Sequence, residues 1–156
     1  MGITIRHSQQ SDFEVILSLI KGLAAFQGMP EKVTNTVELM KTEQSYFRCL
    51  VAENVDGEII GIATYFYAYY TWVGKSLYLD DLYVLQAYRG QKVGTSLLAQ
   101  LFTIAKAENC KKVRWMVSHW NQLAIGFYEK CGAEIDKELC ICDFDSSAID
   151  KFPFTA

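Results

Sequence analysis

The sequence lacks an excess of positive charge. Its 156 residues carry 15 Lys and Arg against 18 Asp and Glu, which gives a formal net charge of −3. Proteins whose main partner is a nucleic acid usually carry a basic patch or a basic overall balance. We therefore expect no nucleic-acid partner, although a local set of donors can still bind an anionic ligand.

Long apolar runs are also missing. No run approaches the roughly 20 residues that a helix needs to cross a bilayer. The first ten residues, MGITIRHSQQ, contain no apolar core of a signal peptide. We expect no membrane partner and no signal peptide, and the hydrophobic fraction of 51% is that of a globular chain with its own core.

The residues that usually bind metals are few and badly spaced for that purpose. The chain has two histidines and no CxxC pair, so we expect no metal site. An odd number of irregularly spaced cysteines is interpreted as reduced thiols of a cytoplasmic protein. These cysteines are Cys49, Cys110, Cys131, Cys140 and Cys142.

Internal repeats and low-complexity linkers are absent, so residues 1–156 are predicted to form a single domain. Apolar residues at helical spacing follow a possible capping box from Ser11 to Glu14, and Asp56-Gly57 between two β-rich runs predicts a hairpin. The fold class is α/β in the mixed α+β sense, since hairpins and one crossover both occur. The order is strand, two helices, three strands, helix, strand, helix, strand, over residues 2–6, 13–23, 34–42, 47–54, 58–70, 76–85, 93–108, 113–118, 121–130 and 138–144.

One stretch indicates anion binding. YRGQKVGTSLL, residues 88–98, lies between a predicted strand and a predicted amphipathic helix. The first N–H groups of a helix are unpaired, and glycines let a phosphate approach the backbone closely. The stretch is neither a Walker loop nor GxGxxG. The alternative interpretation is an ordinary loop with a solvated Arg89 and Lys92.

In context this loop resembles the acyl-CoA-binding segment of the GNAT family of N-acetyltransferases. The family pattern is Arg/Gln-x-x-Gly-x-Gly/Ala; Arg89 and Gly94 match its ends, and Lys92 departs at its middle. The resemblance spans nearly the whole chain and is strongest to the spermidine/spermine (diamine) and thialysine branches. It is carried by LIKGLAAF, YFRCLVAE, TWVGKSLYLDDLYV, YRGQKVGTSLL and WNQLAIGFYEKCGA.

The resemblance implies a GNAT fold, a mostly antiparallel mixed sheet with helices on both faces, and acetyl-CoA as cosubstrate with no metal. It also implies a homodimer, which the apolar tail residues Phe152 and Phe154 would favour. Main-chain groups of one strand would pair with pantetheine, the loop would bind the phosphates, and Asn121 would contact CoA or cap the next helix. The implied cofactor-binding residues are Leu82, Tyr83, Val84, Arg89, Gly90, Gln91, Lys92, Val93, Gly94, Thr95 and Asn121.

Two residues are implied to be catalytic. Tyr128 matches the family tyrosine that protonates the leaving thiolate, a role that suits a hydroxyl protonated at neutral pH. Asp80 matches the acidic residue that helps to deprotonate the amine through water. The alternatives are that Tyr128 is a core aromatic and that Asp80 is a hydrogen-bonded carboxylate that fixes its strand. Strand alternation is expected to place Asp80 and Asp81 on opposite faces.

The implied reaction is direct acetyl transfer to a primary amine of a small molecule: a diamine, a polyamine or a thialysine-like amino acid. Two departures from the polyamine enzymes, Gln27 and Tyr70 in place of acidic residues, make a long polycation a doubtful substrate. The alternatives are a non-catalytic acyl-CoA sensor and an enzyme that acts on protein or peptide amines. The expected substrate-binding residues are Phe26, Gln27, Trp72, Asp80, Asp81 and Trp120.

Two further expectations concern side chains. Lys92 is predicted to have a negative φ, because a left-handed backbone is costly for any residue except glycine, and to project outward toward a CoA phosphate. The aromatic-rich strands are predicted to place Tyr65, Tyr67 and Tyr69 on one face, as sheet packing or as an amine pocket lined by rings.

Overall fold

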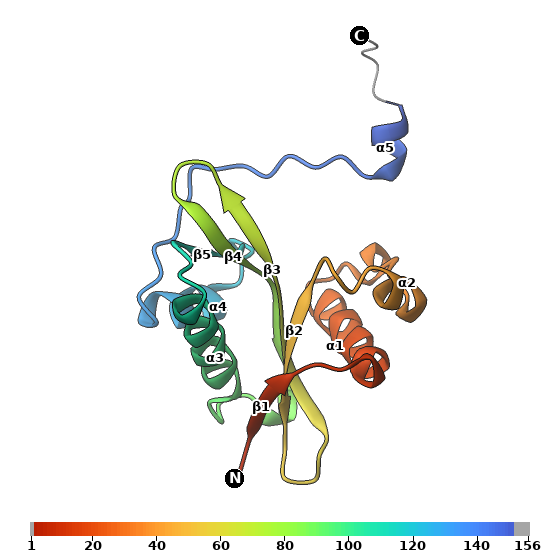
Figure 1. Cartoon of the computed structure of the whole chain (residues 1–156), viewed down its shortest axis with the longest axis vertical. Helices are drawn as coiled ribbons and strands as arrows, with labels where there is room; N and C mark the ends of the chain where they lie inside the picture. The colour runs from red at the N-terminus through yellow and green to blue at the C-terminus, as the bar shows by residue number, and fades with distance from the viewer. Residues whose placement is uncertain (1, 152–156) are drawn as a thin grey trace. The chain divides into compact units, whose positions relative to one another are not determined.

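The computed structural model describes residues 2–151 as two compact units, residues 2–116 and 117–151, and each is described here by itself. In the first unit five strands form one sheet in the order β1-β2-β3-β4-β5 (Figure 1). The first four strands are antiparallel and β5 is parallel to β4, so the predicted mixed, mostly antiparallel sheet is confirmed. The strands are β1 (Thr4–His7), β2 (Arg48–Glu53), β3 (Ile59–Tyr70), β4 (Gly74–Val84) and β5 (Val113–Arg114).

Helices cover both faces of this sheet. Helices α1 (Phe13–Phe26) and α2 (Val37–Thr42) lie on one side, and α3 (Val93–Ala107) lies on the other (Figure 1). The helical spacing seen in the sequence is the spacing that buries each apolar stripe. Between α1 and the sheet the core contains Phe13, Ile16, Leu17, Leu19, Met40, Cys49, Val51 and Ile62, and α3 buries Val93, Leu97, Leu98, Leu101 and Ala105.

The start of α1 differs from the predicted capping box. A short turn, η1 (Gln10–Asp12), precedes the helix, and Asp12 rather than Ser11 is the N-cap of α1; its side chain makes no capping bond to α1 but accepts a hydrogen bond from the Gln9 N–H at 2.7 Å, which closes η1. Asp12 is favoured because Arg6 on β1 donates to its carboxylate at 2.7 Å. That guanidinium holds the pKa of Asp12 below its usual value, so one ion pair fixes both β1 and the entry to α1.

The turns follow the predicted chemistry. Gly57 has φ 80° between β2 and β3, as the Asp-Gly hairpin requires. Gly28 has φ 75° and ends α1, where the Met29 N–H reaches the Ala24 carbonyl at 2.9 Å. Asn109 ends α3 in the same way with φ 54°. This left-handed closure is common at helix C-termini and is tolerated by Asn. Two further short turns are η2 (Pro30–Lys32) and η3 (Gln86–Tyr88).

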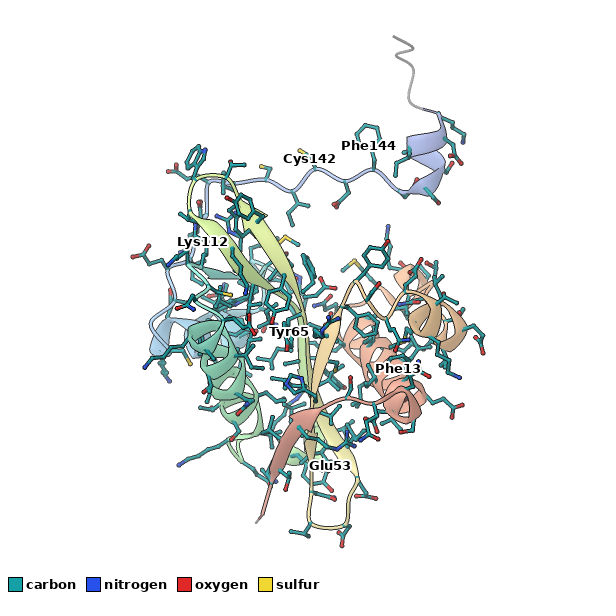
Figure 2. The ribbon with its side chains drawn as sticks, viewed as in Figure 1. Phe13, Glu53, Tyr65, Lys112, Cys142 and Phe144 are labelled. Atoms are coloured by element: carbon teal, nitrogen blue, oxygen red, sulfur yellow. The ribbon has the colours of Figure 1, made fainter. Side chains whose placement is uncertain are left out.

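The second unit contains α4 (Gln122–Lys130) and α5 (Ser146–Asp150). Gly132, with φ 90°, ends α4 as predicted. The strand predicted over 138–144 is wrong: this segment has no strand partner among residues 2–151, and a strand persists only when its main-chain groups are paired. Cys142 and Phe144 lie on this segment (Figure 2). The strand predicted over 113–118 is confirmed only at Val113–Arg114.

Among the described residues, no helix is both long enough and apolar enough to cross a bilayer. The tail residues Phe152 and Phe154, on which the dimer expectation partly depends, lie outside the described residues.

Candidate active site

The loop before α3 has two left-handed residues. Gly90 has φ 76° and Lys92 has φ 65°, ψ 8°. The prediction of a negative φ at Lys92 is therefore wrong. Lys92 is the N-cap of α3, and the chain needs this left-handed turn to pass from the loop into the helix. The family pattern has glycine at this position, so the lysine retains the conformation without the residue that adopts it at low cost.

Free donors gather at the start of α3. The Ser96 N–H is the first to join the helical ladder, donating to the Lys92 carbonyl at 2.9 Å. The three preceding N–H groups, on Val93, Gly94 and Thr95, come too early in the chain to find a carbonyl within the helix. The first turn contains no acidic residue. The helix dipole and these donors together favour an anion at this terminus.

The space in front of the loop is open to a ligand. A Cβ added at Gly90 would meet no atom within 4 Å, and one added at Gly94 would meet only the Val84 side chain, at 3.8 Å. Gln91 turns back to the loop itself, donating through Nε2 to the Ala87 carbonyl at 3.1 Å. The donors and the open approach fit a pyrophosphate, as the sequence predicts for this stretch.

Arg89 connects the loop to α1. Its Nε donates to the Val84 carbonyl at 3.0 Å, and its guanidinium lies over the rings of Phe26, at 5.0 Å, and Tyr83, at 5.6 Å. The Tyr83 hydroxyl in turn lies so close to α1 that a Cβ added at Gly22 would be 3.1 Å from it. The last turn of α1 is therefore held against the loop by Arg89 and Tyr83.

The edge of β4 that faces β5 is unpaired from Leu79 to Val84 within residues 2–151. Within the described residues β5 pairs with β4 only at Leu77 and Tyr78. From Leu79 to Val84, the main-chain groups of β4 on that side have no strand partner within residues 2–151; toward the turn, the Lys75 carbonyl accepts from the Lys111 N–H at 2.8 Å. Such an edge can accept an extended ligand by main-chain hydrogen bonds.

The register decides which β4 groups face this edge. The Leu85 N–H donates to the Ile60 carbonyl at 3.0 Å, and hydrogen-bonded pairs alternate along antiparallel strands. Tyr83 is therefore bonded to β3, whereas Leu82 and Val84 point their main-chain groups outward. Because Arg89 occupies the Val84 carbonyl, Leu82 and the Val84 N–H remain as the groups for a ligand.

The two adjacent carboxylates lie at a bulge in β4. Thr64 pairs with Asp81 but Tyr65 pairs with Leu79, so Asp80 is the extra residue. This bulge interrupts the alternation that the sequence predicts. Asp81 accepts a hydrogen bond from the Thr64 hydroxyl at 3.0 Å. Burial, with a smaller effect of the Asp80 charge, raises the pKa of Asp81 to about 6, and burial also raises the pKa of Asp80.

The same sheet face carries cations farther toward the β3–β4 turn. Arg114 is paired with Tyr78 and therefore shares its face. Its guanidinium lies 4.9 Å from the ring of Tyr70, and the Lys112 ammonium lies 5.9 Å from that ring. Asp80 and Arg114 act in opposite directions on the pKa of Tyr78. Tyr78 therefore lies between a carboxylate and a guanidinium.

The other substrate candidates are not brought together. Phe26 lies beneath Arg89, and Gln27 is the C-cap of α1. Trp72 is 97% exposed at the tip of the β3–β4 turn. Tyr70, at the base of that turn, is six positions along β3 from Thr64, which lies opposite Asp81. At the rise of a strand, Tyr70 is roughly 20 Å from the carboxylates, and Trp72 follows it in the turn.

The remaining candidates belong to the second unit. Asn121 is the N-cap of α4 and accepts from the Ala124 N–H at 3.2 Å, as one of its two interpretations predicts. Tyr128 is a buried residue of α4 whose ring lies 5.4 Å from that of Phe127, and burial raises its pKa above the usual value. Its phenol is thus protonated at neutral pH. Trp120 precedes the helix and is half exposed.

Comparison with known proteins identifies the family. The family model described as "Acetyltransferase (GNAT) family" matches residues 16–133. The chain belongs to the GNAT family. It is an N-acetyltransferase by this membership, and the members of the family use acetyl-CoA as cosubstrate. The match also runs across the boundary between the two described units.

Relatives in sequence agree with this GNAT assignment, and a solved structure shares the fold. The chain is 33% identical over 141 residues to "Thialysine N-epsilon-acetyltransferase" of Mus musculus, covering 83% of each chain. It is 37% identical over 139 residues to "Spermidine/spermine N(1)-acetyltransferase-like protein 1" of Homo sapiens, covering 83% of this chain and 20% of that protein. An integron cassette protein from V. cholerae has the same fold, with a TM-score of 0.79, 22% identity and 99% of each chain covered.

Two residues of this GNAT chain that the sequence did not indicate lie on the face of the carboxylates. Thr64 bonds to Asp81, and Arg114 pairs with Tyr78. The signal for Thr64 was present, because a polar residue among Ile62, Ala63 and Tyr65 has to find a partner when buried. Arg114 could not be found, because its register with β4 is set by a parallel pairing across the chain. No group of three or more His, Cys, Asp or Glu that could hold a metal occurs among residues 2–151.

Proposed function

We propose that this protein transfers an acetyl group from acetyl-CoA to a primary amine of a small molecule: a diamine, a polyamine or a thialysine-like amino acid. One observation carries the proposal. A single unit holds both a helix terminus with N–H groups that have no partner within the helix, at residues 90–95, and two adjacent carboxylates, the exposed Asp80 and the partly buried Asp81, on the strand that leads to it. The loop fits the cosubstrate and the carboxylates fit an ammonium.

The binding of acetyl-CoA would use main-chain groups. The N–H groups of Val93, Gly94 and Thr95 would receive the phosphates, and the outward edge at Leu82 and Val84 would pair with the amides of the pantetheine arm. Main-chain recognition requires a fixed backbone more than a fixed sequence, and this supports a working site despite the departure at Lys92. Asn121 is the second unit's candidate for a contact with CoA.

The carboxylates would prepare the amine. An ammonium must lose a proton before its nitrogen can attack, and a base works best when its pKa lies near the working pH. Asp81, whose pKa burial raises to about 6, fits this requirement. It would accept the proton directly or through water bound at Asp80.

Tyr128 would supply the other proton. Acetyl-CoA provides the acetyl group as a thioester. Asp81 passes the first proton of the ammonium to water before the attack. As the new C–N bond forms and the C–S bond breaks, the nitrogen loses its second proton to the carboxylates, the sulfur takes up the proton of the Tyr128 phenol, and water returns a proton to the phenolate. A phenol with a raised pKa is protonated at neutral pH and can donate.

The charges on the carboxylate face favour an amino acid over a polyamine. Arg114 and Lys112 surround Tyr70, at the position where the polyamine branch has an acidic residue. A long polycation would meet these cations, whereas an amino acid could place its side-chain ammonium at Asp80 and its carboxylate at Arg114. The thialysine enzyme of Mus musculus is a relative whose name specifies such a substrate.

Lysine and cadaverine test this preference, because they differ only in the carboxylate. We expect a higher kcat/KM for lysine or thialysine than for cadaverine, and Arg114→Gln to lower it by about tenfold for the amino acids alone. Equal loss for both amines would reject the Arg114 contact. Acetyl-CoA binding without turnover on any amine would favour the sensor, and turnover only on peptides would favour a protein substrate.

Tyr128→Phe tests the acid. We expect kcat to fall by about 100-fold or more, the usual effect of removing a positioned proton donor, with little change in the Kd for acetyl-CoA. Tyr69→Phe, at a tyrosine that is 75% exposed, is the matched control and should leave kcat unchanged. An unchanged kcat in Tyr128→Phe would exclude this tyrosine as the acid.

Three broader properties belong to the same proposal. We infer that residues 1–156 act as one acetyltransferase domain, supported by the family match across residues 116 and 117. A homodimer and a cytoplasmic location remain predictions. Light scattering at micromolar concentration tests the dimer. The free thiols of Cys49, Cys110 and Cys131 are compatible with a reducing compartment.

A further inference from the structure

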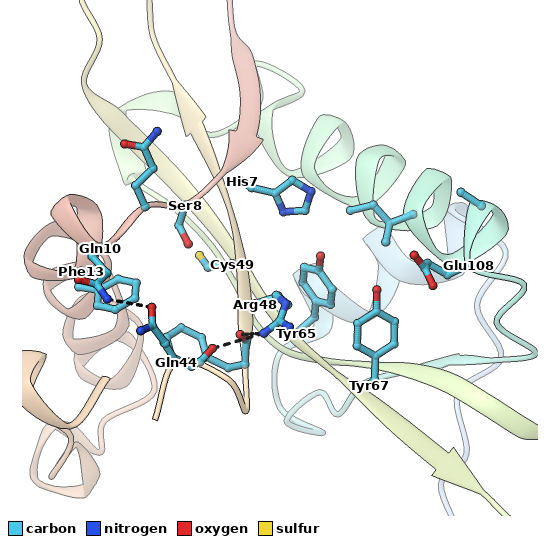
Figure 3. A pocket seen from close by; sticks show the side chains of 14 residues that line it. His7, Ser8, Gln10, Phe13, Gln44, Arg48, Cys49, Tyr65, Tyr67 and Glu108 are labelled. Carbon is cyan, nitrogen blue, oxygen red and sulfur yellow. Dashed lines mark hydrogen bonds between the residues drawn. The ribbon is translucent and has the colours of Figure 1, made fainter. Parts of the chain in front are cut away.

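A hollow lies on the other side of Thr64 along β3 from the loop, and it is lined by Tyr65 and by Cys49, the strand partner of Thr64. It has a volume of about 650 Å³ and is formed within the first unit (Figure 3). None of the residues assigned above to acetyl transfer lines it. We call it the Tyr65 pocket; its lining residues relevant here are His7, Phe13, Phe47, Arg48, Tyr65 and Glu108.

Tyr65 supplies an unused donor at the base of this pocket. Its side chain is only 1% exposed. Among the described residues every fully enclosed side-chain nitrogen or oxygen has a partner, whereas no hydrogen bond to the Tyr65 hydroxyl is formed within residues 2–151. That hydroxyl therefore opens into the pocket. Burial raises its pKa to about 12, so it is a proton donor at neutral pH.

Arg48 makes the pocket cationic. Its Nη1 donates to three main-chain carbonyls, the shortest bond being 2.8 Å to that of Phe47. No acidic side chain pairs with Arg48 in the part of the chain that the structure describes. The one acidic residue of the lining, Glu108, is bound by Lys75 at 2.5 Å. One positive charge is thus left uncompensated beside the Tyr65 hydroxyl.

The geometry is that of a ligand site rather than of a packing defect. In Figure 3 the side chains of His7, Arg48, Tyr65 and Glu108 surround the same open space. Arg48 lowers and Glu108 raises the pKa of Tyr65, so both charges act at the ring that carries the unused hydroxyl. Phe13 and Phe47, with ring centroids 5.7 Å apart, give the pocket an apolar wall.

We propose that the Tyr65 pocket binds a small carboxylate, whose oxygens accept hydrogen bonds from the Tyr65 hydroxyl and the Arg48 guanidinium and whose apolar body lies against Phe13 and Phe47. A carboxylate matches a planar guanidinium and a phenol donor better than a neutral group does. The pocket shares no residue with the proposed acetyl-transfer site, so the two sites can be tested independently.

Benzoate is the probe, and benzamide is its neutral counterpart of the same shape. Both are titrated into the full chain and followed by two-dimensional NMR, with and without saturating acetyl-CoA. We expect benzoate to shift resonances of the pocket and to bind at least about tenfold more tightly than benzamide, since charge-assisted bonds are the stronger ones. Acetyl-CoA should leave its Kd unchanged.

Two variants and one control locate the contacts. Arg48→Gln is expected to weaken benzoate binding by about tenfold, and Tyr65→Phe by about threefold or more. Lys41→Gln removes a cation from the exposed side of α2 and should have no effect. Thermal unfolding checks that each variant is folded. If Arg48→Gln does not fold, Tyr65→Phe, which loses only one oxygen, still tests the proposal.

Four results would overturn the proposal: no benzoate binding, equal binding of benzamide, binding that is indifferent to both Arg48→Gln and Tyr65→Phe, or a pocket covered by a second copy of the chain in solution. Acetyl transfer is measured on the same samples, so that a failure of the pocket proposal can be distinguished from a failure of the proposed function. Loss of benzoate binding with intact turnover refutes only the pocket.

Discussion

Lys92 offers the sharpest test of how the loop is built. It is the N-cap of α3 with φ 65°, in a region that side chains enter at a cost of about 1–2 kcal/mol. Its ammonium also stands at the positive end of the helix dipole. Replacing Lys92 with Gly should relieve both costs, whereas Lys92→Ala should relieve only the charge, because its Cβ remains.

The expected magnitudes follow from these terms. Removing a cation from a helix N-terminus contributes about 0.3–1 kcal/mol at low salt. Glycine adds about 1–2 kcal/mol of relieved strain and loses about 0.5–1 kcal/mol to the greater entropy of the unfolded chain. Lys92→Gly should therefore raise the free energy of unfolding by about 1 kcal/mol, and Lys92→Ala by about 0.5 kcal/mol or less.

Urea unfolding at low and high salt is the assay. Salt should reduce the gain of Lys92→Ala and leave most of the gain of Lys92→Gly, because only the charge term is screened. Asn109→Gly is the control: it has a similar φ, 54°, but at a helix C-terminus where Asn is already tolerated, so little change is expected. A Lys92→Gly variant less stable than the wild type would refute the left-handed assignment.

Two other changes have defined outcomes. The pKa of Asp81 is raised from 3.8 to about 6 in the fold, so the folded state holds more protons between these values and stability falls as pH rises through them. Asp81→Asn should therefore be more stable than the wild type by about 3 kcal/mol at pH 8 and equal to it below about pH 4. An equal gain at both pH values in urea unfolding would contradict this. Arg89→Lys loses the planar group that stacks on Phe26 and Tyr83 and so orders the loop. The KM for acetyl-CoA should therefore rise by about tenfold, with kcat nearly unchanged. An unaltered KM would show that the stacking does not order the loop.

Most of the fold could be predicted, because it depends on local patterns. Helical spacing located α1 and α3, and Asp56-Gly57 located the β2–β3 hairpin. The two failures have a common cause. The segments 113–118 and 138–144 have strand composition, but a strand also needs a neighbour, and the pairing partner is not encoded in the segment itself. The α1 cap was misplaced for a similar reason, since Arg6 on β1 selects Asp12.

The sequence indicated the residue types of the candidate site but not their geometry. The sequence located the loop and the carboxylate pair, and both occur on the same unit. It could not show the bulge that makes Asp80 an extra residue, because bulges depend on the register between β3 and β4. Nor could it show that Arg89 stacks on Phe26, since α1 and the loop are far apart in sequence.

The error at Lys92 has a physical explanation that bears on function. The prediction treated the cost of a left-handed lysine as decisive, but the loop has to turn into α3 at that residue whatever its side chain. A cost of about 1–2 kcal/mol is small beside the burial of the apolar face of α3, at roughly 1.5–3 kcal/mol for each large side chain. The fold therefore imposes the turn on the lysine. Since the N–H groups that we propose as anion donors follow this turn, a substitution that preserves the turn is expected to preserve their arrangement.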